Sequence, residues 1–150
     1  MAIVDSERYS LVLVLDSNCD KVNAMSILAL FRDWEDVEEY RAGTVIFSEQ
    51  DPADVMYVIM AGEIELTLHG KPLGVEGEAG IIGEMAVIPS ATCSATAKTL
   101  TQVRLARLDQ DQIKIFIDEH TEFAPHVMAV MANRLRAVDK FITTQFTQIR

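Results

Sequence analysis

The spacing of apolar positions changes twice along the chain. Between Ser26 and Glu39, apolar residues recur at intervals of three and four with acidic residues on the other face, which is typical of short amphipathic helices. From Thr44 to Leu108 the apolar period falls to two, and from Asp109 onward it returns to that of a helix. The pattern therefore predicts short helices, then a β-structure, then further helices.

The middle of the chain predicts short strands separated by glycine-rich turns, with a hairpin turn at His69–Pro72. Their spacing of about ten residues is typical of an antiparallel barrel. We predict a mainly β fold with flanking helices, namely an antiparallel β-barrel or jelly roll (double-stranded β-helix) with short N-terminal helices and a long C-terminal helix. We expect a domain over residues 24–150, with the barrel at about 41–108 and C-terminal helices at about 109–150, while the pattern does not define residues 1–23. The predicted strands are Thr44–Phe47, Met56–Met60, Ile64–Leu68, Leu73–Val75, Ile81–Ile82, Ser94–Ala97 and Gln102–Leu108.

The C-terminal region predicts two helices, the second of them long. Asp109 is a good N-cap for the first, and Pro125 suits the first turn of the second, where its missing N–H is tolerated. The second helix carries an apolar stripe that alternates steps of three and four, as at the a and d positions of a coiled coil. Either the stripe packs onto the barrel of its own chain, or it forms the seam of a homodimer over Met128–Ile149. The stripe comprises Met128, Met131, Leu135, Val138, Ile142, Gln145 and Ile149.

The charge and the cysteine content limit which partners and which cellular compartment we expect. The chain of 150 residues has 13 Lys and Arg against 23 Asp and Glu, a formal net charge of −10. Non-specific binding to nucleic acid or to anionic membranes needs clustered cations, so we expect neither partner. The two cysteines, Cys19 and Cys93, make no disulfide framework, and the N-terminus has no basic region before its short apolar run. These features predict a cytoplasmic protein with reduced thiols.

The segment that carries candidate chemistry is Gly80–Ala97. Gly83 permits a positive φ, and the N–H groups of Glu84, Met85 and Ala86 would open a short helix. Free amides at such a position form an anion site, and the Glu84 carboxylate could accept hydrogen bonds from a diol. The residues alone leave two interpretations open: a phosphate-and-sugar site, or an ordinary capped turn inside a barrel.

This segment resembles the phosphate-binding cassette of cyclic nucleotide-binding domains. The core of the resemblance is Gly83-Glu84-Met85-Ala86-Val87, followed at the family's distance by Ser94-Ala95-Thr96. It continues downstream through Phe123–Arg136, which is similar to the helix after the barrel, and covers about residues 28–140. Upstream it includes Ala42-Gly43, Ile46-Phe47, Glu49, Asp51, Met56-Tyr57-Val58-Ile59 and Gly62-Glu63-Ile64.

The resemblance implies a role for each matching residue. The Gly83 turn and the amides of Glu84, Met85 and Ala86 would face the cyclic phosphate of cAMP or cGMP. The Glu84 carboxylate would accept a hydrogen bond from the ribose 2′-hydroxyl. From the opposite strand, Ser94 and Ala95 would approach the phosphate or the base.

The chain departs from the family at the cation that pairs with the phosphate. In the family an arginine precedes the Ser/Thr-Ala pair, and here that position is Cys93. A hydrogen bond to a charged group contributes roughly 1.5–3 kcal/mol. At 1.4 kcal/mol for each factor of ten, its loss predicts binding weaker by roughly ten- to a hundred-fold.

Smaller departures from the family point in the same direction. Gln50 stands in place of a turn glycine, and Ala79-Gly80 stands in place of a Gly-Asp pair. Dimeric gene regulators of the family place hydroxyl side chains where this chain has Val138 and Asp139.

Two functions follow as hypotheses. The first is a stand-alone regulatory domain, with no helix-turn-helix, that senses a cyclic nucleotide weakly and signals to an unknown protein partner through its C-terminal helix. The second is a ligand-free dimeric interaction module of the same fold. We expect no enzyme and no metal site, because His69, His120 and His126 do not cluster in the sequence. Cys93 is either an inert buried residue or a redox-sensing thiol in the pocket.

Overall fold

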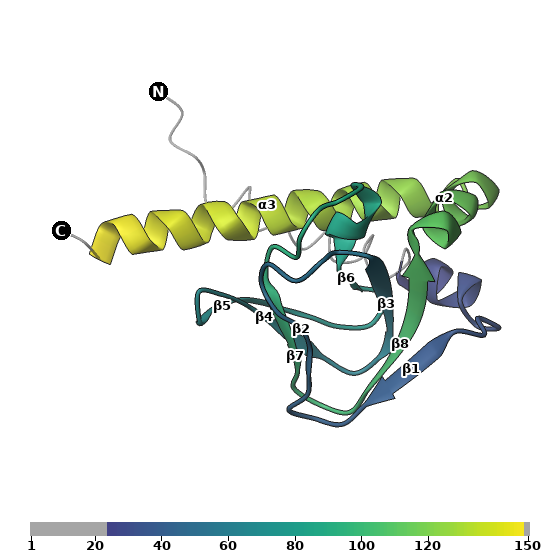
Figure 1. Ribbon diagram of the computed structural model, residues 1–150, viewed down its shortest axis with the longest axis horizontal. Coiled ribbons are helices and arrows are strands. Elements are labelled where there is room, and N and C mark those ends of the chain that lie inside the picture. The colour runs from purple at the N-terminus through teal and green to yellow at the C-terminus, as the bar shows by residue number, and fades with distance from the viewer. Residues whose placement is uncertain (1–23, 149–150) are drawn as a thin grey trace, which may run out of the picture.

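A computed structural model describes residues 24–148. Residues 24–30 form a helix, the strands follow, and the chain ends in a long helix that lies along one side of the strands (Figure 1). The undefined segment 1–23 and the last residue of the predicted stripe, Ile149, lie outside the described residues. The predicted order of helix, β-structure and helix is confirmed.

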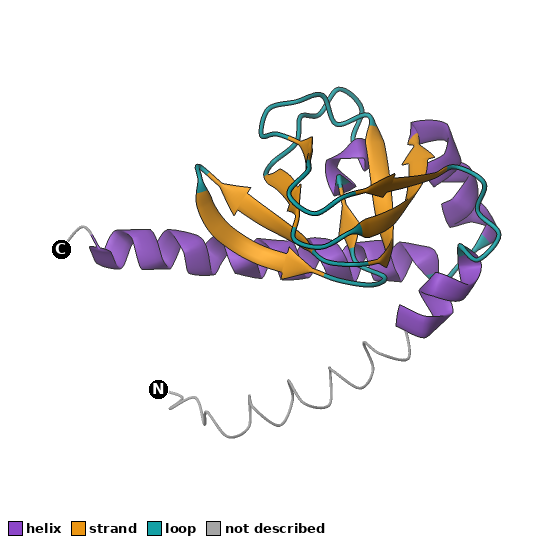
Figure 2. Cartoon of the chain, turned by 90° about the horizontal axis from the view of Figure 1, so that it is seen from below, coloured by secondary structure: helices purple, strands orange, loops and turns teal. Residues whose placement is uncertain are grey.

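The strands form two antiparallel sheets that face each other (Figure 2). Apart from one hairpin in the second sheet, neighbouring strands come from distant parts of the sequence, as in a jelly roll, so the predicted fold class is confirmed. The first sheet has the order β1 (Val37–Tyr40), β8 (Val103–Asp109), β3 (Val55–Ala61) and β6 (Ile81–Ile82). The second has the order β2 (Val45–Phe47), β7 (Thr96–Thr99), β4 (Ile64–Leu68) and β5 (Lys71–Glu76).

Apolar and polar residues that alternate in the sequence lie on the inward and outward faces of the strands, respectively. In β4, Ile64 and Leu66 are almost fully buried, while Glu65 and Thr67 on the other face are only partly buried. Such a period of two places one set of side chains in the core of a sandwich. The interior between the sheets is filled by Ile59, Ile64, Leu66, Ile82, Ala95, Ala97, Val103 and Leu105.

A second core lies between the first sheet and the helices. Helix α2 (Gln110–Glu119) begins at Asp109, whose side chain accepts from the Gln112 N–H in a capping box, as the N-cap prediction requires. A cluster of aromatic rings then joins the helix at 24–30, α2 and the start of α3 (Phe123–Gln148). The cluster consists of Phe31, Trp34, Phe116 and Phe123.

The prediction of short helical pieces over Ser26–Glu39 is correct only at the start of this range. The helix ends at residue 30, and Val37–Tyr40 is strand β1, paired with β8. The Arg107 guanidinium of β8 lies 3.3 Å from an Asp36 carboxylate oxygen and 3.6 Å from one of Glu38. Two of the acidic residues that suggested a solvated helix face are therefore paired with a neighbouring strand. The pairing of strands that are distant in sequence overrides the local helical pattern. The strands thus begin at residue 37 rather than at about 41.

Helix α3 packs one face onto the barrel and leaves another exposed. The packed face carries Phe123, Val127 and Val130, all buried. Three residues of the predicted stripe lie on the exposed face: Met128 and Leu135 are 68% and 64% exposed, and Ile142 is 46% exposed. Two others do not, because Met131 packs against the core and Gln145 accepts a hydrogen bond from Lys71 of β5. Along residues 24–148, no helix has both the length and the apolar composition that crossing a bilayer requires.

Candidate ligand-binding site

The predicted turn at Gly83 forms at the end of β6 and is pressed against β3. Gly83 has φ 73° and ψ 28°, and the short 3₁₀ turn η1 (Glu84–Val87) follows it. A Cβ atom at Gly83 would lie 2.5 Å from the Val55 carbonyl oxygen. Both the left-handed φ and the close approach to β3 therefore require glycine at this position.

The turn exposes fewer amides than the sequence predicted. The Ala86 N–H donates to the Gly83 carbonyl oxygen at 3.0 Å, and Ala86 itself is 1% exposed and belongs to the core beneath the helices. The Ala86 N–H is thus used within the 3₁₀ turn of this structure, and a contact between this amide and a ligand stays a prediction. The amides of Glu84 and Met85 are the two that this turn does not use.

The opposite wall of the site is the loop before β7. The predicted strand Ser94–Ala97 is wrong at its start, because β7 begins at Thr96 and Ser94 and Ala95 form a bend. Backbone bonds hold this loop: the Gln50 N–H donates to the Cys93 carbonyl oxygen at 3.0 Å, and the Cys93 N–H donates to the Asp51 carbonyl oxygen at 2.8 Å. Pairing with the residues before β3 thus fixes where Cys93 lies.

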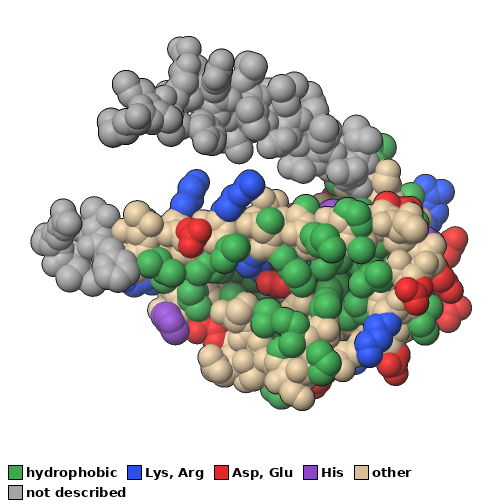
Figure 3. Space-filling model, turned by 90° about the horizontal axis from the view of Figure 1, so that it is seen from above, with side chains coloured by type: hydrophobic (Ala, Val, Ile, Leu, Met, Phe, Trp, Pro, Cys, Tyr) green, Lys and Arg blue, Asp and Glu red, His purple; other side chains and the backbone are tan. Residues whose placement is uncertain are grey.

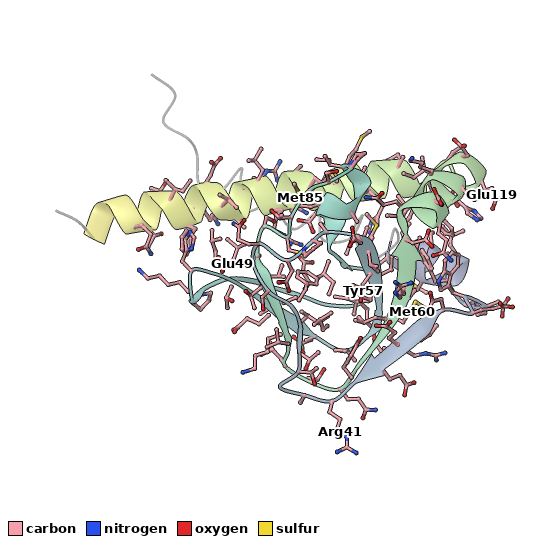
Figure 4. The ribbon with its side chains drawn as sticks, viewed as in Figure 1. Arg41, Glu49, Tyr57, Met60, Met85 and Glu119 are labelled. Atoms are coloured by element: carbon pink, nitrogen blue, oxygen red, sulfur yellow. The ribbon has the colours of Figure 1, made fainter. Side chains whose placement is uncertain are left out.

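One cavity brings six of the seven predicted site residues together. It is enclosed by η1, by the loop before β7 and by α3; Figure 4 shows Met85 in front of α3. The six residues are Gly83, Glu84, Met85, Cys93, Ser94 and Ala95, and the cavity is completed by Phe47, Leu66 and Arg134.

Arg134 is the functional residue that sequence reasoning missed. Its guanidinium donates to a Glu84 carboxylate oxygen at 3.4 Å, to one of Glu76 at 3.1 Å and to the Ile81 carbonyl oxygen at 3.2 Å. Arg134 and Glu84 are only 9% and 5% exposed. The signal in the sequence was a cation in register with Val127 and Val130 on the packed face of α3, where a charge needs a buried partner.

These contacts close the site. The space left between its walls is about 10 Å³, which is enough for one water molecule at most. Among the described residues, every buried side-chain nitrogen and oxygen has a hydrogen-bond partner. The side chains of the protein itself therefore satisfy the polar groups of the site, and a ligand has room only if α3 or the turn moves.

The charge around this cavity is negative. Arg134 is the only cationic side chain among the described residues that line it, and it faces two carboxylates, Glu84 and Glu76. Burial raises the pKa of Glu76, although the neighbouring Arg134 lowers it. Burial also raises the pKa of the Cys93 thiol, and the charges of Asp51 and Glu84 add to this effect. Cys93 is thus a neutral thiol at neutral pH, which disfavours the redox-sensing interpretation.

No group of three or more His, Cys, Asp or Glu side chains within residues 24–148 is arranged to hold a metal ion. His126 instead makes a structural contact: its ring Nε2 lies 2.8 Å from the Ala79 carbonyl oxygen, joining α3 to the segment before β6.

The jelly roll holds a glycine turn and a buried glutamate next to a long helix. This arrangement agrees with the resemblance found in the sequence. Residues 37–120 match the cyclic nucleotide-binding domain family. The chain belongs to this family. The matched region contains β1 to α2 and therefore the whole site except Arg134.

Curated relatives are regulators and larger enzymes. A CRP-like cAMP-activated global transcriptional regulator of Mycobacterium tuberculosis is 26% identical over 120 residues, which are 77% of this chain and 53% of the regulator. A cGMP-dependent protein kinase of Caenorhabditis elegans is 33% identical over 70 residues, which are 47% of this chain and 9% of the kinase. This chain therefore spans about half the length of the regulator and a small part of the kinase.

Solved structures share the fold. A c-di-GMP responsive global regulator of Xanthomonas campestris matches with a TM-score of 0.67 at 21% identity, over 79% of this chain and 63% of its own. The EAL enzyme Bd1971 in its cAMP-bound form matches with a TM-score of 0.52 at 30% identity, over 75% of this chain and 32% of its own. A chain described as PKAR CBD2 with bound Sp-2Cl-cAMPS matches with a TM-score of 0.64 at 15% identity, over 79% and 86%.

Two departures from the family pattern occur where the backbone favours glycine. Gln50 has φ 71° and Ala79 has φ 65°, both in the left-handed region. The resemblance places a glycine at each of these positions. At these two positions the chain therefore carries residues with a side chain in a backbone conformation that glycine adopts more readily.

Proposed function

We propose that this chain is a non-enzymatic regulatory module in which a weakened cyclic nucleotide site controls the position of α3. The observation that carries the proposal is the contact between Glu84 and Arg134. By the resemblance, Glu84 is the residue that would bind the ribose, and in this structure its carboxylate is held by a guanidinium on α3. Ligand binding at Glu84 and the position of α3 are therefore mutually dependent.

Weak affinity follows from the charge of the site. A cyclic nucleotide carries one negative charge. The cavity is lined by one carboxylate, Glu84, and by the Arg134 guanidinium, which also pairs with Glu76 outside the cavity, and neutral Cys93 stands at the position of the family's arginine. Among the described residues that line the cavity, an incoming phosphate meets no unpaired cation. The first two amides of η1 remain as donors, and they supply hydrogen bonds without a full positive charge.

Titration calorimetry with cAMP and with cGMP tests this proposal on the wild type, Cys93→Arg and the neutral control Cys93→Ser. We expect weak binding by the wild type and by Cys93→Ser, and binding about ten- to a hundred-fold tighter by Cys93→Arg. Tight binding by the wild type would overturn the weakened site. If no variant binds either nucleotide, the cavity is not a nucleotide site, and the second function below is favoured.

The second candidate function is a ligand-free dimeric interaction module. The closed cavity and the exposed stripe of α3 favour it, since Met128, Leu135 and Ile142 form an apolar line that its own barrel does not cover. The exposed side chains of Val87 and Ile88 extend the apolar surface of the molecule near η1.

Sedimentation velocity tests the dimer with Leu135→Lys against Ile115→Lys. Both residues are exposed and helical, at 64% and 56%, but Ile115 lies on α2, away from the stripe. We expect a dimer for the wild type and for Ile115→Lys, and a monomer for Leu135→Lys. A monomeric wild type, or a dimer that survives Leu135→Lys, would contradict the seam.

A further inference from the structure

A groove follows one flank of α3 and is separate from the ligand-binding cavity. Its outer part, about 700 Å³, lies between α3 and the β4–β5 hairpin, and its inner part, about 280 Å³, lies between α3 and the helix at 24–30. Asn133 borders both parts, so they follow one another along the helix. We call the two parts together the α3 groove.

The α3 groove and the exposed stripe lie on opposite flanks of the helix. At about 100° per residue, Met128, Leu135 and Ile142 point about 180° away from the mean direction of the groove residues on α3. Those groove residues include Asn133, Lys140 and Thr144. Figure 3 shows Lys and Arg side chains along one edge of α3 and hydrophobic side chains along the other. A dimer formed through Met128, Leu135 and Ile142 would therefore leave the groove open except at its edge near Gln145, which belongs to the predicted stripe but lines the groove.

The outer part of the groove combines apolar surface with positive charge. Its apolar lining includes Leu73 and Phe141, and the cations Lys71, Arg136 and Lys140 border it. No carboxylate lines this part of the groove, although the chain carries a net charge of −10. The surface therefore suits an apolar segment with acidic residues beside it.

The chain itself supplies such a segment next to the groove. Ala24 lines the inner part, so the chain meets the groove at that residue. Upstream is the apolar run Leu11–Leu15, followed by Asp16, and residues 1–16 contain three acidic residues and one arginine.

The length of the connection fits the groove. Along α3, the distance from Ala129, in the inner part, to Lys140, in the outer part, is 11 residues or about 16 Å. The eight residues from Asp16 to Ala24 reach about 12 Å as a helix and about 26 Å when extended. The apolar run can therefore lie against Leu73 and Phe141 without strain in the connection.

We propose that residues 1–23 dock along the α3 groove, with Leu11–Leu15 against its apolar floor and the acidic residues near Lys71, Arg136 and Lys140. A segment bound there ties α3 to the barrel and the β4–β5 hairpin. If the proposed function above is correct, this segment also holds Arg134 on Glu84 and opposes opening of the site.

Disulfide trapping in the full chain tests the proposal. In a Cys19→Ser, Cys93→Ser background, each residue from 12 to 15 is changed to Cys in turn and combined with Thr144→Cys, in the groove. The matched control replaces Thr144→Cys by Asp139→Cys, because both residues are exposed on α3 but Asp139 lies outside the groove. Mild oxidation followed by intact-mass analysis and a non-reducing gel measures the intramolecular and intermolecular disulfides.

We expect at least one position between 12 and 15 to form an intramolecular disulfide with residue 144 at a yield about tenfold above that with residue 139. Lys140→Glu should lower this yield several-fold. Equal yields at 144 and 139, or no disulfide at 144, would overturn the proposal. A disulfide that appears only between chains would also overturn it and would assign the groove to a second copy. None of these results depends on nucleotide binding, so the test stands apart from that of the proposed function.

Discussion

Replacing Arg134 with methionine is expected to destabilise the fold strongly. Methionine keeps much of the apolar length of arginine but leaves Glu84, which is 5% exposed, with a buried and unpaired carboxylate. Removing one partner of a buried ion pair costs about 3–5 kcal/mol. Because Glu76 is less buried than Glu84 and can turn toward water, we take the lower end, about 3 kcal/mol.

Urea denaturation measures this loss, and thermal unfolding should show a melting temperature lower by about 6–12 °C for a chain of this size.

The control for this prediction is Arg104→Met, at an exposed position on β8, which should change stability by no more than about 0.5 kcal/mol. The double variant Glu84→Gln, Arg134→Met removes the buried charge and should recover part of the loss. If Arg134→Met is no less stable than Arg104→Met, the ion pair does not hold α3 on the site, and the coupling between them is refuted.

Three further predictions concern backbone strain and pH. Gln50→Gly should stabilise the fold by about 0.5 kcal/mol, measured by urea denaturation, because φ 71° favours glycine; a loss of stability would contradict the strain. Gly62→Ala should destabilise it by about 2–3 kcal/mol, because the new Cβ would lie 2.4 Å from the Gln102 carbonyl oxygen at φ 95°; an unchanged urea midpoint would contradict this. Burial raises the pKa of Glu76 in the folded state above its ordinary value of 4.5. The contribution of Glu76 to the free energy of unfolding should therefore fall as pH rises from 4.5 through this raised pKa. Glu76→Gln should lose that part of the pH dependence, and an identical profile would exclude Glu76 as its source.

The sequence predicted the strands whose side chains alternate between core and solvent. In β4, each neighbour in the sequence lies on the opposite face, so the local pattern carries the information. It could not predict β1, because Val37–Tyr40 has no strong alternation of its own and becomes a strand by pairing with β8. The contacts of Arg107 that secure β1 join residues about 70 positions apart.

The candidate site likewise has one part that the sequence predicted and one part that it could not predict. The turn at Gly83 was predictable because a glycine, a short helix and their amides are neighbours in the sequence. The closure was not, since Arg134 and Glu84 are 50 residues apart and meet only when α3 lies across the barrel. Ser94 and Ala95 line the cavity, but they form a bend where the sequence predicted the start of a strand. The backbone of the preceding residue, Cys93, is held there by hydrogen bonds with Gln50 and Asp51.

The closed site also defines what any ligand must provide in order to open it. Moving Arg134 away leaves Glu84 buried without a donor, so a ligand must donate to that carboxylate, as a pair of sugar hydroxyls does. It must also occupy far more than the present 10 Å³, which only a displacement of α3 or η1 permits. A ligand shifts the position of α3 only by the difference between its affinities for the open and closed states. In this chain the closed state already satisfies every buried polar side-chain atom of the described residues. Under the proposed function, Cys93 stands where the family's arginine would pair with the phosphate, so the equilibrium should favour the closed state more strongly than it would with that arginine. Cys93→Arg is then expected to shift the equilibrium back toward the open state when a cyclic nucleotide is present.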